Sequence, residues 1–194
     1  MQQAFSSTHL ENLMPTFESI FHQLHCRAEA PPLFPTQPFD PEISRLVLET
    51  DDEAFGSHMG THAAAARIGL LLLNDDLQSA HPLSQDMKNA TGSCWHAIIH
   101  RREGDFNNSL YWWRLTGVHP AFSAVYEAVV ETPEQDEKAQ EFLSLLQREK
   151  TWQPDAFVAC CREAKQTKQD HAWLRRAQLA EMTTLLEWCR NGGA

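Results

Sequence analysis

The chain lacks several features that mark common classes of protein. It has no run of basic residues, and 26 acidic against 16 basic side chains give a net charge of -10. Nucleic-acid binding relies on neutralising phosphates, and anionic membrane surfaces attract basic segments, so we expect neither partner. Apolar runs such as Leu70–Leu73 are far shorter than the about 20 residues that a transmembrane helix needs.

Targeting and disulfide signals are scarce as well. Residues 1–11 have neither a basic start nor an apolar core, which predicts no signal peptide. The five cysteines form no C-x-x-C pair, and two of them, Cys160 and Cys161, are adjacent. An odd number of cysteines without metal-type spacing is typical of reduced thiols packed as small apolar groups. We therefore expect a cytoplasmic protein.

Strand signals are nearly absent, whereas helical spacing of apolar residues recurs along most of the chain. Half of the ten prolines lie in residues 31–41, which predicts an extended connector there. A helix is expected to begin directly after Asp40. We expect an all-α fold of antiparallel helical hairpins around an aromatic core, forming one domain over residues 1–194. The other helices are expected over residues 5–27, 58–73, 76–81, 93–103, 106–116, 119–130, 134–150, 155–166 and 171–190.

The richest part of the sequence is residues 95–114. This stretch holds two histidines, three arginines, two acids and three of the six tryptophans. Gly104 and Asp105 divide it, because glycine ends helices and aspartate caps the start of the next one. We expect helices over 93–103 and 106–116 to form an antiparallel pair with Asp105 as N-cap.

The helical wheel of residues 95–103 separates two kinds of polar side chain. Arg102 lies on the apolar face with Trp95, and a buried guanidinium needs a carboxylate partner. We therefore expect Arg102 to be buried and paired. His96, His100 and Glu103 lie on another face, where two imidazoles at i and i+4 can bind one metal ion.

Other histidines could join this metal site, and a structural role for all of them is the alternative. His81 or His119 is expected to reach the site from a neighbouring element, and His58-x-x-x-His62 repeats the spacing. In an enzyme, Glu103 or Asp105 would serve as ligand or general base. The alternative is that these histidines are core residues bonded to carbonyls or to nearby acids.

The arginines support a second kind of site. Arg101, Arg102 and Arg114 lie across one hairpin, and guanidinium groups bind carboxylates or phosphates bidentately. Internal ion pairing is the alternative for these groups. The full set of expected pocket residues is His96, His100, Arg101, Arg102, Glu103, Asp105, Asn108, Trp112, Arg114 and His119.

Two resemblances follow from these residues. The run Trp95-His96-x-Ile98-x-His100-Arg101-Arg102-Glu103-Gly104-Asp105-Phe106-x-Asn108-Ser109-x-Tyr111-Trp112 resembles a motif of an uncharacterised family of bacterial and fungal proteins, over roughly residues 60–122. That family implies no reaction. The turn Gly104-Asp105-Phe106 with Ser109 is similar to the hairpin of tetratricopeptide repeats.

Two functions follow as expectations. The first is a His/Arg/acid-lined pocket that binds a small anionic ligand or a divalent metal through His96 and His100. The second is a protein-interaction module whose helical hairpins present a groove to a peptide or partner helix. A closed polar cavity would favour the first, and an exposed apolar groove the second.

Overall fold

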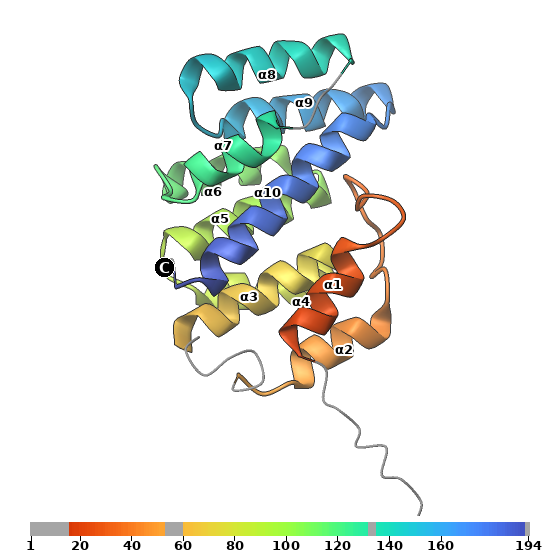
Figure 1. Cartoon of the computed structure of the whole chain (residues 1–194), viewed down its shortest axis with the longest axis vertical. Coiled ribbons are helices and arrows are strands. Elements are labelled where there is room, and N and C mark those ends of the chain that lie inside the picture. The colour runs from red at the N-terminus through yellow and green to blue at the C-terminus, as the bar shows by residue number, and fades with distance from the viewer. Residues whose placement is uncertain (1–15, 53–59, 132–134, 193–194) are drawn as a thin grey trace, which may run out of the picture.

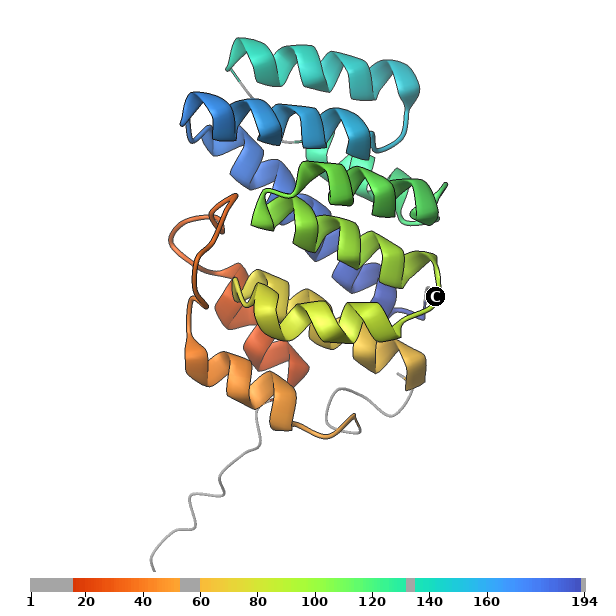
Figure 2. The same ribbon diagram turned by 180° about the vertical axis from the view of Figure 1, so that it is seen from behind.

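The computed structural model describes residues 16–52, 60–131 and 135–192, and within them it is helical with no strands. This confirms the all-α prediction. Figure 1 shows the helices stacked along the long axis of the molecule, and Figure 2 shows the same stack from behind. The helices are α1 Phe17–His25, α2 Pro41–Glu49, α3 Gly60–Leu73, α4 Leu77–Asp86, α5 Ala90–Glu103, α6 Phe106–Thr116, α7 Phe122–Val130, α8 Glu137–Glu149, α9 Pro154–Thr167 and α10 Ala172–Arg190.

Helix α3 is the apolar centre of the lower half of the stack. Ile68 and Leu70–Leu73 are fully buried, as expected for a helix that is apolar all round. Helix α10 crosses α3 diagonally (Figure 1) and packs on it closely. Gly69 makes this crossing possible, because a Cβ there would lie 2.8 Å from Leu186 Cδ1.

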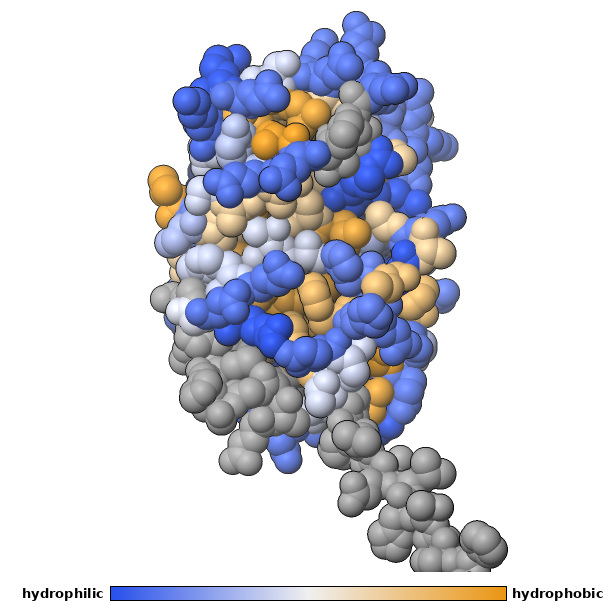
Figure 3. All heavy atoms as spheres, in the orientation of Figure 1, coloured by the Kyte–Doolittle hydropathy of each residue, from blue (hydrophilic) through white to orange (hydrophobic). Residues whose placement is uncertain are grey.

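An aromatic cluster fills the upper half, between α8, α9 and α10. Phe142, Trp152, Phe157 and Trp173 are each at most 5% exposed, and their neighbouring rings lie 5.0–5.8 Å apart. Ring pairs at such distances add stability beyond the area they bury. On the face of the molecule that Figure 3 shows, hydrophilic side chains divide the apolar surface into small areas.

Helix α4 is longer than the sequence predicts. The expected helix ends at His81, before Pro82, but α4 continues through Pro82 to Asp86. Proline in a helix interior removes one backbone hydrogen bond. Here the carbonyl that loses its partner belongs to Gln78, an exposed residue whose backbone water can satisfy. The extra turn carries Gln85 toward the histidines described below.

Candidate metal centre

The hairpin of α5 and α6 supplies most of the candidate site. The Asn89 side chain caps α5 by accepting a hydrogen bond from the Gly92 N–H at 2.8 Å. The helix ends at Gly104, whose φ of +84° is one that glycine adopts without strain. Asp105 then caps α6 by accepting from the Asn108 N–H. The predicted helical pair with Asp105 as N-cap is confirmed.

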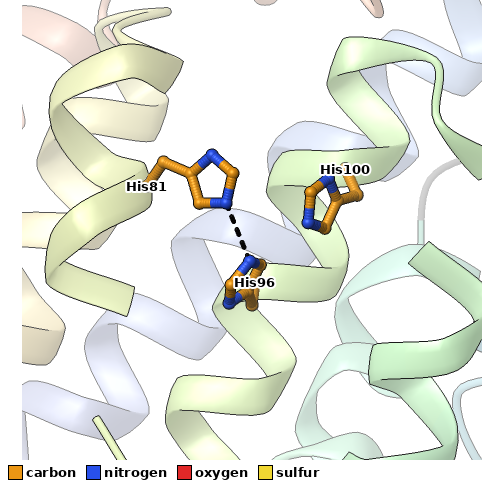
Figure 4. Close-up of side chains that lie close together, drawn as sticks. All are labelled: His81, His96 and His100. Atoms are coloured by element: carbon orange, nitrogen blue, oxygen red, sulfur yellow. Dashed lines mark hydrogen bonds between the residues drawn. The ribbon is translucent and has the colours of Figure 1, made fainter. Parts of the chain in front are cut away.

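Three histidines meet between α4 and α5. His96 and His100 lie one turn apart on α5, and His81 faces them from α4 (Figure 4). His81 Nε2 lies 2.8 Å from His96 Nε2, and one ligand atom from each ring lies within 4.8 Å of the others. His96 and His100 are buried, while the His81 side chain is 28% exposed. The cluster therefore sits at the edge of the core.

Glu103 hydrogen-bonds to one of these rings and lies near a second. Its carboxylate lies 2.8 Å from His100 Nδ1 and 3.5 Å from His81 Nδ1. A carboxylate only accepts, so the His100 proton belongs on Nδ1, and the nearby negative charge favours the same tautomer for His81. The Nε2 lone pairs of His81 and His100 are then left for another partner.

Helix α6 completes the cluster from a third side. The Asn108 amide donates to His100 Nε2 at 3.0 Å, and Trp112 stacks on His96 at 4.0 Å with an interplanar angle of 10°. On α4, the Gln85 amide lies 3.4 Å from His81 Nε2. The three rings thus contact one another, Glu103 and two carboxamides. Within the described residues, these hydrogen bonds go to side chains and not to backbone carbonyls.

The environment keeps the imidazoles of His81 and His96 neutral. Burial, with repulsion from His100 and His81, lowers the pKa of His96 to about 4. Burial also lowers the pKa of His81, although the Glu103 charge opposes it. The hydrogen bond from His100 holds the pKa of the Glu103 carboxyl below its usual value. At neutral pH, His81 and His96 are therefore unprotonated bases beside a carboxylate, which is the form that binds metals.

His96 is incompletely satisfied. Its Nδ1 atom is buried and has no hydrogen-bond partner within the described part of the chain. A buried polar atom left in this way costs about 1–3 kcal/mol. The ring is held by the Trp112 stack and by one hydrogen bond to the His81 imidazole, and this placement leaves only Nδ1 unsatisfied.

The arginines lie elsewhere and pair with carboxylates, although the Nε atoms of Arg101 and Arg102 are buried without a hydrogen-bond partner among the described residues. Arg102 is buried and pairs with Asp75, as predicted, and it also donates to the Pro32 carbonyl at 3.1 Å. Arg101 makes a two-pronged ion pair with Glu181, which also accepts from the Trp152 indole at 3.0 Å. Internal pairing, the alternative interpretation, therefore describes Arg101 and Arg102.

Asp75 binds two guanidinium groups, those of Arg27 and Arg102. Its left-handed backbone, with φ of +62°, is uncommon outside glycine, although Asp and Asn adopt it more readily than most residues. Arg27 Nη1 lies 2.8 Å from one carboxylate oxygen, and Arg102 binds the other. The predicted break at Asn74-Asp75 is thus also an ion-pair centre that the sequence alone did not reveal.

The remaining expected site residues are not in the cluster. His119 is buried beside Trp188, where its Nδ1 accepts from the Ala121 N–H at 3.2 Å and its Nε2 lies 3.2 Å from Thr91 Oγ1. Of the two histidines expected to approach, His81 is the one that does. Arg114 and Asp105 are exposed. His58 and the side chain of His62 lie outside the described residues.

Comparison with known proteins adds no relative. No protein family matches the chain, and neither does any curated protein or solved structure. The resemblances to the bacterial and fungal family and to tetratricopeptide hairpins stay predictions. Within the described residues, every helix is too short or too polar to cross a membrane.

Proposed function

We propose that the chain binds one divalent transition-metal ion, of the kind represented by zinc, through His81, His96 and His100. The observation that carries the proposal is the convergence of three imidazoles, with the Nε2 atoms of His81 and His96 facing each other and that of His100 facing the Asn108 amide. Imidazole nitrogen suits zinc and its neighbours in the first transition row. No thiolate enters the cluster, since the cysteines lie elsewhere or are buried in the core.

One pair of nitrogens is close to the spacing of a loaded site, and the ligand atoms of all three rings lie within 4.8 Å of one another. A tetrahedral zinc with Zn–N bonds of about 2.0–2.1 Å holds its nitrogen ligands about 3.3 Å apart. The His81 and His96 Nε2 atoms are 2.8 Å apart and share one proton. Metal binding at His96 Nε2 would move that proton to Nδ1 of the same ring and would separate the two Nε2 atoms by about half an ångström. The partly exposed His81 side chain on α4 is the ring that has room to move.

Glu103 supports the same assignment. Metal-binding histidines almost always donate their other ring N–H to a carboxylate or carbonyl, which fixes the tautomer and strengthens the ligand. Glu103 lies at this position for both His81 and His100. It thus acts behind the ligands, in place of the ligand or base role that the sequence suggests.

Binding of an anion by the arginines has less support. The guanidinium groups of Arg101 and Arg102 are buried against Glu181 and Asp75, so no free donor fork faces solvent from them. The interaction-module alternative stays a prediction. Its best support is the exposed apolar series Tyr111, Leu115 and Val118 at the end of α6.

Titration calorimetry of metal-free protein with zinc tests the proposal. We expect one ion per chain for the wild type and loss of this binding in His96→Phe, which keeps a ring against Trp112. His25→Ala is the matched control, because it removes an exposed histidine far from the cluster in sequence and should leave binding unchanged. Equal binding by wild type and His96→Phe would contradict the proposal.

A further inference from the structure

We infer that the metal site, when loaded, is open: the protein supplies three nitrogen ligands, and a small anion or water from solvent takes a fourth position. This inference rests on the proposed function. Within the described residues, His81, His96 and His100 are the group of potential ligands that converges here. Structural zinc sites have four protein ligands, whereas sites that bind an exogenous molecule have three.

Glu103 does not fill the fourth position. Both of its carboxylate oxygens face ring Nδ1 atoms, one of His100 and one of His81. A carboxylate that moved to the metal would abandon the two contacts that fix the ligand tautomers. The geometry therefore keeps Glu103 behind the rings and leaves the metal short of one ligand.

The charge of the site favours an anion. Three neutral imidazoles leave the 2+ charge of the ion uncompensated among its protein ligands, and the Glu103 carboxylate neutralises only part of it from behind. An anionic fourth ligand completes the neutralisation. This assigns the site a ligand class of hydroxide, carboxylate or a small inorganic anion.

Two carboxamides are placed to hold such a ligand. Asn108 Nδ2 lies 3.0 Å from His100 Nε2, and Gln85 Nε2 lies 3.4 Å from His81 Nε2. Each amide lies where its ring would bind the metal, so the metal displaces both amides, and their N–H groups can then donate to a fourth ligand beside it. Asn108 and Gln85 are therefore positioning residues for the bound anion.

Solvent has access to the cluster. The side chains of His81 and Glu103 are 28% and 35% exposed. A small ligand can therefore reach the edge of the cluster at His81 without unfolding a helix.

Cobalt substitution gives the test, because the visible spectrum of Co²⁺ reports its coordination. We expect one Co²⁺ per chain, with a spectrum that changes on titration with azide. Asn108→Leu should bind Co²⁺ but bind azide about tenfold more weakly, the value of one lost hydrogen bond to a charged group. Asn107→Leu, on the neighbouring exposed residue, should match the wild type.

Two results would overturn the inference in different ways. Uptake of Co²⁺ through the three histidines with a spectrum unchanged by saturating azide would show a closed site, and it would leave the proposed function standing. Failure to take up Co²⁺ would overturn the proposed function and the open site with it. Equal loss of azide affinity in Asn107→Leu and Asn108→Leu would remove the positioning role of Asn108.

Discussion

Two neighbouring groups of polar residues on α5 differ in their partners and in their access to solvent. The arginine pair, Arg101 and Arg102, is fully buried, and each guanidinium binds a buried carboxylate. The histidine pair, His96 and His100, meets a third imidazole and a carboxylate that are both partly exposed. Burial against an opposite charge is typical of structural groups, whereas titratable groups that cluster near solvent are typical of a ligand site.

The largest effect should come from the arginine pair. Arg102→Leu leaves Asp75 buried with Arg27 as its remaining cation, so we expect the free energy of unfolding to fall by about 3–5 kcal/mol in urea denaturation. Arg45→Leu is the control, since its ion pairs with Glu42 and Glu49 are exposed and should contribute little to stability. Similar losses in the two variants would remove the contrast.

A structural histidine gives the next effect, through pH. Burial lowers the pKa of His119 to about 4 in the folded chain, against 6.5 for the free group. The unfolded chain therefore binds a proton first as the pH falls. Stability should decline from about pH 6.5 to pH 4 and then level, with about 3 kcal/mol from this group. His119→Asn should show a shallower decline, and an unchanged slope would contradict this role.

The Glu103→Gln change tests the support behind the metal ligands. A glutamine oxygen still accepts a hydrogen bond, but it lacks the charge that strengthens the His81 and His100 rings as ligands. We expect zinc affinity to fall about 10- to 100-fold, as for other residues that hold metal-binding histidines. Calorimetry measures this loss, and an affinity equal to that of the wild type would place Glu103 outside the site.

The smallest expected effect is on the stability of His96→Phe without metal. Phenylalanine keeps the stack on Trp112 and removes the buried unpartnered nitrogen, so the free energy of unfolding should stay within about 1 kcal/mol of wild type or rise. Denaturation of metal-free protein checks this. A loss as large as that of Arg102→Leu would mean that His96 is a structural residue.

Local features of the site were accessible from the sequence. Gly104 and Asp105 mark the hairpin because their backbone preferences act within a few residues. The spacing of His96 and His100 places both on one face of α5, and the apolar neighbours of Arg102 predict its burial. Each of these inferences needs only the geometry of one helix.

Long-range partners were not accessible in the same way. Glu181 and Asp75 reach the arginines from α10 and from the turn after α3, and no pattern in a single segment marks them. Likewise, His81 reaches the cluster because α4 packs on α5, while His119, just before α7, accepts a hydrogen bond from the Ala121 N–H. Which histidine joins the cluster is decided by packing between helices.

Anomalous diffraction from crystals soaked in zinc shows whether the three histidines hold one ion. We expect one strong peak within about 2.0–2.2 Å of the Nε2 atoms of His81, His96 and His100, with Glu103 behind two of the rings. A peak elsewhere on the chain, or none at the cluster while the rings keep their 2.8 Å contact, would contradict it.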